Sequence, residues 1–256
     1  QIIVKPIEFE ITCSSGSKTV EVSKFGAYVE RMIAIPEGVD PSKITTGVIL
    51  NSDGTFSHVP TVITMIDGKY YAKISSLTNS AYLLIYSPKT FQDVKNHWAQ
   101  KDIYDMASRL IISGVGNDLF EPERSITRAE FSAVMVRALG LRPEEYKNDF
   151  FDVKAGEWYS EYISTLSSYG LVRGYDDRTF KPDGNITRQE AMAILARAMD
   201  TTKLGEELEI DASHILAVFN DNADVSGWAK DSVSKCVKAG VVTGRDLAQA
   251  CKDSYS

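Results

Sequence analysis

The sequence predicts an α+β protein in which a small β-sandwich-like domain precedes mainly α-helical repeats. Three observations predict this. Polar and apolar side chains alternate through much of residues 1–88, as they do in strands with one buried face. From Phe91 onward the character changes to helices separated by Gly- and Asp-rich loops. Within that second part, motifs recur after about 60 residues, which indicates a repeated structural unit.

Length and charge narrow the classes of function. The chain has 256 residues, enough for two domains, and 43% of them are hydrophobic and 25% charged. Its net charge of −7 argues against nucleic acid as the main partner, because phosphate binding needs a basic face. No apolar run approaches the roughly 18 residues that predict a membrane span. The chain opens on QIIVKPIEFE without Met or a signal peptide, and we interpret it as an internal fragment of a longer precursor.

The β half contains six or seven predicted short strands, enough for a small sandwich or the end of a larger β domain. The clearest alternation lies in residues 28–35, 55–65, 69–74 and 81–85. Asp67-Gly68 between two such runs predicts a two-residue hairpin turn. The glutamates of this half form no recognisable pair, and His58 has no Ser or Cys partner in view, so we identify no catalytic residues.

The helical half divides into two full repeats and a shorter third one. We assign them to residues 91–148, 149–200 and 219–256, with 201–218 as a linker. At the opening of the second repeat, the match between Asp93 and Asp152 is ambiguous by one residue. The pairs that match at a constant interval of 60 are Trp98 and Trp158, Ile103 and Ile163, Gly114 and Gly174, Phe120 and Phe180, Pro122 and Pro182, and residues 126–130 and 186–190. Asp221, Trp228 and Gly244 continue the pattern, but the chain ends before a third Ile-Thr-Arg-x-Glu segment.

Each Ile-Thr-Arg-x-Glu segment predicts a helix start. Thr127 and Glu130 have the spacing of a capping box, in which the hydroxyl accepts one backbone N–H and the carboxylate accepts another. Thr187 and Glu190 repeat this spacing. A structural role is sufficient to explain these four residues.

The arginines in the same segments have no role in capping. Arg128 and Arg188 occupy the first helical position, where the helix dipole mildly opposes a cation. A guanidinium beside free N–H groups would bind an anion, above all a carboxylate that accepts two parallel bonds. The alternative is a surface arginine paired with a nearby acid. If the arginines bind a ligand, replacing either with Ala should weaken binding without unfolding the chain.

These ordered motifs resemble the S-layer homology family over about 165 residues. The second repeat carries the resemblance best in residues 170–182, GLVRGYDDRTFKP, whereas the first lacks the tyrosine at Val115. The resemblance implies the C-terminal anchoring region of a bacterial cell-surface protein, located outside the cell at the wall or S-layer. It also implies a pseudo-threefold arrangement of repeats, with grooves between neighbours that bind secondary cell-wall polysaccharide, often one bearing a pyruvate ketal. The missing third arginine should weaken one or more grooves.

The resemblance also suggests which residues contact the polysaccharide. Tryptophan rings offer flat faces to sugars, although a Trp at this point of a helix can equally belong to the core. The candidate binding residues are Arg128, Arg188, Trp98, Trp158, Trp228, Asp93, Asp152, Asp221, Gly114, Gly174 and Tyr175.

Other interpretations are weaker. The acidic loop 176–185 lacks the alternating ligands and closing Glu of a calcium-binding EF-hand, and turns stabilised by Asp side chains explain it better. No cofactor or metal site is identified. Cys236 and Cys251 could form a disulfide, but inert thiols are favoured. Two other functions remain open: a fragment of a surface-attached glycoside hydrolase, and repeats that mediate protein–protein assembly.

Overall fold

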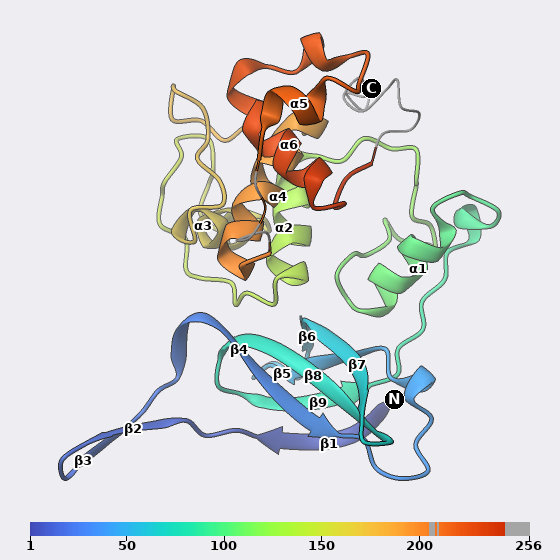
Figure 1. Ribbon diagram of the computed structural model, residues 1–256, viewed down its shortest axis with the longest axis vertical. Coiled ribbons are helices and arrows are strands. Elements are labelled where there is room, and N and C mark those ends of the chain that lie inside the picture. Colours follow the sequence, from blue (N-terminus) through green and yellow to red (C-terminus); the bar gives the residue numbers. More distant parts are fainter. Residues whose placement is uncertain (205–207, 209, 244–256) are drawn as a thin grey trace. The chain divides into compact units, whose positions relative to one another are not determined.

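The computed structural model describes residues 1–204, 208 and 210–243. They form two compact units, and Figure 1 follows them along the chain. The first unit contains residues 1–123 and 134–142; the second contains residues 124–133 and the described residues from Pro143 onward. Gly244, the terminal segment 247–253 and the question of a Cys236–Cys251 disulfide lie outside the described residues.

The first unit is built on three antiparallel sheets. One has the strand order β1-β9-β5-β6, the second β4-β8-β7, and β2 and β3 form a separate hairpin. The strands are β1 (Ile2–Glu8), β2 (Thr12–Ser15), β3 (Lys18–Glu21), β4 (Lys24–Ala34), β5 (Thr46–Leu50), β6 (Phe56–Val59), β7 (Thr61–Ile66), β8 (Lys69–Thr78) and β9 (Ala81–Ile85).

The two larger sheets share one apolar core. Ile33 and Ile74 from the three-stranded sheet pack in the same cluster as Val59, Tyr82 and Leu84 from the four-stranded sheet. Inward-facing residues of two packed sheets are what define a sandwich. The predicted sandwich-like β domain is thus present in the first unit.

Two local features of this domain follow directly from the sequence. Asp67 and Gly68 both have positive φ, 48° and 75°, and join β7 to β8 as the predicted two-residue turn. The run 55–65, predicted as one strand, is divided by Pro60 into β6 and β7, which belong to different sheets. Proline has no N–H to donate to a ladder, so a break at this position is expected.

The α-helices begin after the sheets, as predicted. The α-helices are α1 (Gln100–Ser108), α2 (Arg128–Ala138), α3 (Ser160–Ser168), α4 (Arg188–Thr202), α5 (Ala212–Leu216) and α6 (Lys230–Lys238). The 3-10 helices are Pro41–Lys43, Gln92–Val94, Asn222–Asp224 and Gly227–Ala229. An α+β chain with antiparallel sheets followed by a helical region is therefore confirmed. The predicted linker 201–218 contains α5, and the pseudo-threefold arrangement stays a prediction.

The first repeat begins within the first unit, where the end of α1 packs on the β domain. Leu110 packs against the cluster of Val48, Leu83 and Ile85, and Arg109 donates a hydrogen bond of 3.3 Å to the carbonyl of Thr61. His58 lies buried nearby, and its Nδ1 is 2.9 Å from the Thr46 hydroxyl. Burial, helped by the charge of Arg109, lowers the pKa of His58 to about 4, so the imidazole is neutral at pH 7.

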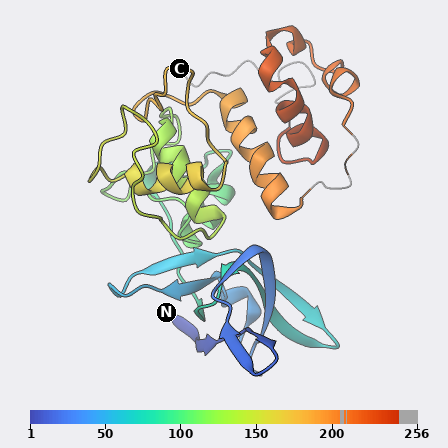
Figure 2. The ribbon, with the colours of Figure 1, turned by 90° about the vertical axis from the view of Figure 1, so that its left-hand side faces the viewer.

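The core of the second unit joins α4 to the third repeat. Met192 and Met199 of α4 pack with Leu216 of α5 and with Val233 and Cys236 of α6. Figure 2 shows α4 beside these helices. Cys236 is a buried thiol whose pKa burial raises to about 11, so it is inert as a nucleophile at neutral pH.

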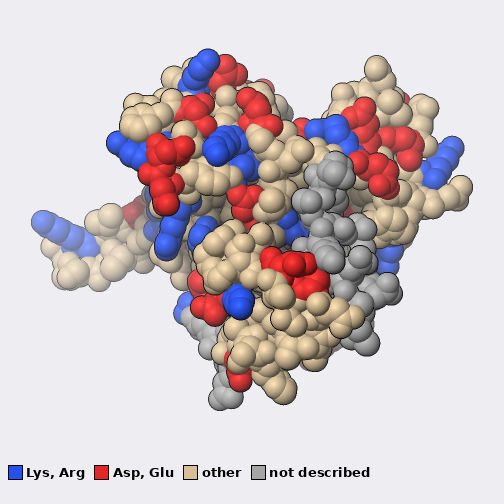
Figure 3. All heavy atoms as spheres, turned by 90° about the horizontal axis from the view of Figure 1, so that it is seen from above, with Lys and Arg blue, Asp and Glu red and all other residues tan. Residues whose placement is uncertain are grey.

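Charges of both signs occur on the face seen in Figure 3, where Lys and Arg side chains are interspersed with Asp and Glu.

Among the described residues, no helix has both the length and the apolar character needed to cross a bilayer.

Candidate functional site

The opening phenylalanines fix the alignment of the two repeats. The ring of Phe91 lies 5.4 Å from that of Phe120, and the ring of Phe150 lies 5.3 Å from that of Phe180. Phe151, in contrast, is 68% exposed. The equivalent of Phe91 is therefore Phe150, at an interval of 59, and one extra residue enters the second repeat before the tryptophan.

The same alignment makes Asp152 the equivalent of Asp93. Asp93 accepts hydrogen bonds from the N–H groups of Phe120 (3.0 Å) and of the following residue (2.7 Å). Asp152 accepts the equivalent pair from Phe180 (2.7 Å) and its successor (2.7 Å). Both carboxylates thus hold a loop of their own repeat. Asp221, which matches Asp152 in the third repeat, is buried.

The two glycines give room for this packing. A Cβ on Gly114 would lie 2.3 Å from the carbonyl oxygen of Leu119 and 2.6 Å from the ring of Phe91. On Gly174 it would lie 2.5 Å from the ring of Phe150, and the φ of Gly174 is +66°. Real Cβ atoms do not approach so closely, so both positions need glycine for packing.

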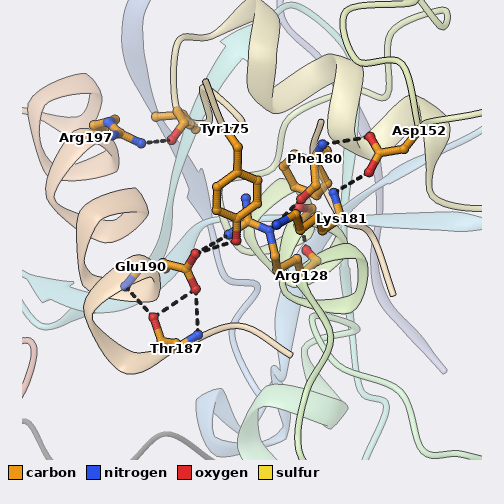
Figure 4. Close-up of polar contacts among 10 residues, drawn as sticks. Arg128, Asp152, Tyr175, Phe180, Lys181, Thr187, Glu190 and Arg197 are labelled. Atoms are coloured by element: carbon orange, nitrogen blue, oxygen red, sulfur yellow. Dashed lines mark hydrogen bonds and ion pairs between the residues drawn. The ribbon is translucent and has the colours of Figure 1, made fainter. Parts of the chain in front are cut away.

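Arg128 lies buried between the first and second repeats. Its guanidinium carbon is 4.8 Å from the ring centre of Tyr175 and 4.6 Å from that of Phe180. Nε donates to the carbonyl of Phe180 at 2.7 Å, and Nη1 pairs with Oε1 of Glu190 at 3.0 Å. Figure 4 shows this convergence. The side chain is only 7% exposed.

The N–H groups at the start of α2 are also occupied. The N–H of Arg128 donates to the carbonyl of Gly184 at 2.8 Å, and that of Ala129 to the carbonyl of Pro182 at 2.9 Å. The free N–H groups predicted beside Arg128 are therefore absent, and that part of the prediction was wrong. The antiparallel contact of the two repeats satisfies them, a long-range pairing that the local motif does not reveal.

Glu190 connects the cap to this contact. Besides the Arg128 pair, its Oε1 accepts a hydrogen bond from the Tyr175 hydroxyl at 2.8 Å. Oε2 accepts the N–H of Thr187 at 2.9 Å, completing the predicted capping box. Burial acts to raise the pKa of Glu190, but the Thr187, Tyr175 and Arg128 contacts outweigh it and hold the pKa below its usual range. Glu190 does more than cap α4.

The first repeat keeps the cap but pairs its glutamate differently. Glu130 donates its N–H to the Thr127 hydroxyl at 3.2 Å and accepts the N–H of Thr127 at 2.9 Å. Its carboxylate also holds Arg124 through two bonds, of 2.7 and 3.2 Å. Arg124 belongs to the same repeat, whereas Arg128 reaches Glu190 from the preceding one.

Arg188 has a different environment from its counterpart. It is half-buried at the start of α4. Within the described part of the chain, its guanidinium forms no hydrogen bond or ion pair. The two arginines, equivalent by motif, thus differ in their surroundings.

A pocket of about 480 Å³ adjoins the Arg128–Glu190 pair, and we call it the arginine pocket. Residues 172–176 of the second repeat and side chains of α4 form most of its wall. Its lining residues are Arg128, Val172, Arg173, Gly174, Tyr175, Asp176, Glu190, Ala193, Ile194, Arg197 and Trp228. All three repeats contribute to it. It brings together four predicted binding residues: Arg128, Gly174, Tyr175 and Trp228.

The three tryptophans do not belong to the core. Trp98, Trp158 and Trp228 are 81%, 55% and 60% exposed. Only Trp228 of the three lines the arginine pocket. The core alternative is therefore wrong for all three side chains.

Two arginines of the pocket, Arg173 and Arg197, were not among the predicted residues. Arg197 reaches the pocket from α4, where its Nη1 donates to the carbonyl of Leu171 at 2.9 Å. It matches Arg137 at the interval of 60, a recurrence that the sequence does show. Arg173 stands where the first repeat has Ser113, so no repeated signal marks it.

The acidic loop 176–185 is held by its own side chains. Asp177 accepts hydrogen bonds from the N–H (2.9 Å) and hydroxyl (2.6 Å) of Thr179, the predicted Asp-stabilised turn. Among the described residues, no group of three or more His, Cys, Asp or Glu side chains is placed to hold a metal ion.

Comparison with known families decides what the repeats are. The model of the S-layer homology domain matches residues 90–132 and 149–192. These two segments are S-layer homology domains. Domains of this family anchor surface proteins to the cell wall, and the chain is accordingly assigned to the bacterial cell surface.

Three relatives with similar sequence differ in name and in the share of their own length that matches. An amylopullulanase of Thermoanaerobacterium thermosulfurigenes is 32% identical over 92% of this chain and 12% of its own length. A cellulosome-anchoring protein of Acetivibrio thermocellus is 34% identical over 58% of this chain and 32% of its own length. A surface layer protein of Brevibacillus choshinensis is 30% identical over 39% and 9%. The chain therefore spans only a minor part of each of these relatives.

Proposed function

We propose that the chain holds its parent protein on cell-wall polysaccharide by binding the glycan in the arginine pocket. One observation carries the proposal: an open pocket combines three arginines with the exposed ring of Trp228. Guanidinium groups suit an acidic glycan, such as one bearing a pyruvate ketal, because they bind carboxylates through paired hydrogen bonds. The flat indole suits the apolar face of a sugar ring.

The other candidate residues divide by role. Trp228 contacts the sugar, and we assign the same role to Trp98 and Trp158, whose rings are similarly exposed. Arg128 and Tyr175 form the wall at which the first and second repeats meet. Arg188 is proposed to contact the glycan as well, because it is half-buried and has no partner among the described residues. The remaining candidates act indirectly, by holding the loops: Asp93, Asp152, Asp221, Gly114 and Gly174.

Trp228→Ala is expected to weaken binding to wall sacculi by about 5- to 150-fold, since stacking on an aromatic face contributes about 1 to 3 kcal/mol where it has been measured for nucleobases. The measurement is co-sedimentation with sacculi of the bacterium that makes the amylopullulanase relative. Phe151→Ala is the matched control, because Phe151 is also an exposed aromatic residue but lies outside the arginine pocket. Equal loss in both variants would contradict the assignment of Trp228.

The same assay tests the ligand. Wild-type chain should sediment with intact sacculi and stay in solution when their polysaccharide has been chemically stripped. Continued sedimentation after stripping would overturn polysaccharide as the ligand and favour an assembly role, with a protein component of the wall as partner.

We further propose that the anchored cargo is a polysaccharide hydrolase. The relative that matches 92% of this chain, β domain included, is named an amylopullulanase, whereas the two matched S-layer homology segments cover far less of the chain. The β domain would then be the part that joins the enzyme to its anchor. Glycan hydrolysis by the full-length protein, with none by residues 1–256 alone, is the expected result.

A further inference from the structure

We propose that the acidic group of the bound glycan is held by Arg173 and Arg197 and not by the motif arginine Arg128. The inference rests on the proposed function and adds to it a second-repeat anion subsite. It identifies two specificity-determining residues that the repeat motif does not include.

The charge of Arg128 is already matched. Its Nη1 pairs with Glu190 at 3.0 Å, its Nε is bound to the Phe180 carbonyl, and its guanidinium lies against two aromatic rings. The Arg128 side chain is 7% exposed, and it would have to give up some of these contacts in order to bind a ligand. Arg128 therefore forms part of the wall of the site and is not its anion receptor.

Arg173 and Arg197 have no such match. Arg197 is half-buried and has one neutral acceptor, the Leu171 carbonyl. Arg173 is exposed, and within the described residues it forms no hydrogen bond or ion pair. Asp176 also lines the pocket, but it is paired with neither arginine. Two positive charges thus share one pocket without a bound counter-charge among the described residues.

Electrostatics favours an anion at this place. Burial, helped by the charge of Arg173, lowers the pKa of Arg197, so the two guanidinium groups are close enough to oppose each other's charge. An oxyanion between them would relieve that repulsion and accept charge-assisted bonds from both. A carboxylate and a phosphodiester share this chemistry.

Of the two complete repeats, only the second has the residues that form this subsite. The first repeat has Arg137 at the position of Arg197, but Ser113 at the position of Arg173 and Val115 at that of Tyr175. Arg173→Ser therefore gives the second repeat the residue that the first already has, in an exposed position where no hydrogen bond is lost. This makes it a clean test variant.

Arg173→Ser is expected to bind polysaccharide released from the sacculi about 10- to 100-fold more weakly, as for loss of a hydrogen bond to a charged group. Its binding should also be less sensitive to NaCl than that of wild type. Arg197→Gln, which keeps a donor for the Leu171 carbonyl, should show a similar loss. Arg178→Asn is the control: it removes the same charge outside the pocket, at a φ of 60° that Asn tolerates.

Amidation of the glycan carboxylates separates the sources of the anion. If wild-type binding falls to the level of Arg173→Ser, the anion is a carboxylate; if it survives while Arg173→Ser still binds weakly, the anion is a phosphodiester. Arg173→Ser binding as well as wild type would overturn the subsite, and the proposed function would stand if Trp228→Ala still weakened binding. Failure of wild type to bind the released polysaccharide at all would instead count against the proposed function.

Discussion

Arg128→Ala is expected to destabilise the second unit by about 3 to 4 kcal/mol, as observed when one partner of a buried ion pair is removed. The substitution leaves the Glu190 carboxylate, 17% exposed, without its cation and the Phe180 carbonyl without its donor. It also removes a guanidinium packed between two rings. Urea unfolding followed by tryptophan fluorescence would measure the change.

The motif itself offers the control for this experiment. Arg188→Ala changes the same residue at the same helical position in the next repeat, but Arg188 is half-buried and has no partner among the described residues. Its expected cost is below about 0.5 kcal/mol. Equal losses for the two variants would contradict a structural role specific to Arg128. The sequence alone predicts that Arg128→Ala weakens binding without unfolding the chain; the buried contacts of Arg128 lead us to expect a loss of stability as well.

Gly174→Ala is expected to cost about 3 kcal/mol through two effects that add. Its φ of +66° disfavours any residue with a Cβ by about 1 kcal/mol, and overpacking in a tight site costs a further 1 to 3 kcal/mol. The new Cβ would lie 2.5 Å from the Phe150 ring and 2.7 Å from the Thr179 carbonyl. Thermal unfolding would show a lowered midpoint, and the displaced loop would also distort the arginine pocket.

Gly156→Ala separates the two effects. Gly156 has a φ of +83°, but a Cβ added there would meet nothing within 4 Å, so only the backbone cost of about 1 kcal/mol remains. A loss for Gly174→Ala no larger than that for Gly156→Ala would show that the contact with Phe150 relaxes freely.

Much of the fold could be predicted because its determinants are local. Alternation, the Asp67-Gly68 turn and the two capping boxes depend on residues close in sequence, and the structure confirms each of them. The repeat interval predicted that the two repeats have similar local structure, and the matched Phe and Gly residues do pack in the same way in both. The break at Pro60, between β6 and β7, could not be predicted from the alternation of polar and apolar residues, which continues across it.

The site was harder to predict because it is built from contacts between repeats. Nothing near Arg128 in the sequence shows that Glu190, 62 residues later, will neutralise it. The motif drew attention to residues that recur, and several of these, such as Asp152 and Gly174, hold the loop. Arg173 does not recur in the first repeat, so the repeat pattern does not mark it.

Hydrogen–deuterium exchange of the full chain, with and without polysaccharide released from the sacculi, tests the central claim most directly. Binding in the arginine pocket predicts slower amide exchange in peptides that cover residues 172–176 and Trp228. The first-repeat loop 112–116, which has Ser113 in place of Arg173, serves as the internal reference and should change less. Unchanged exchange at 172–176 under conditions where the polysaccharide binds would contradict the claim.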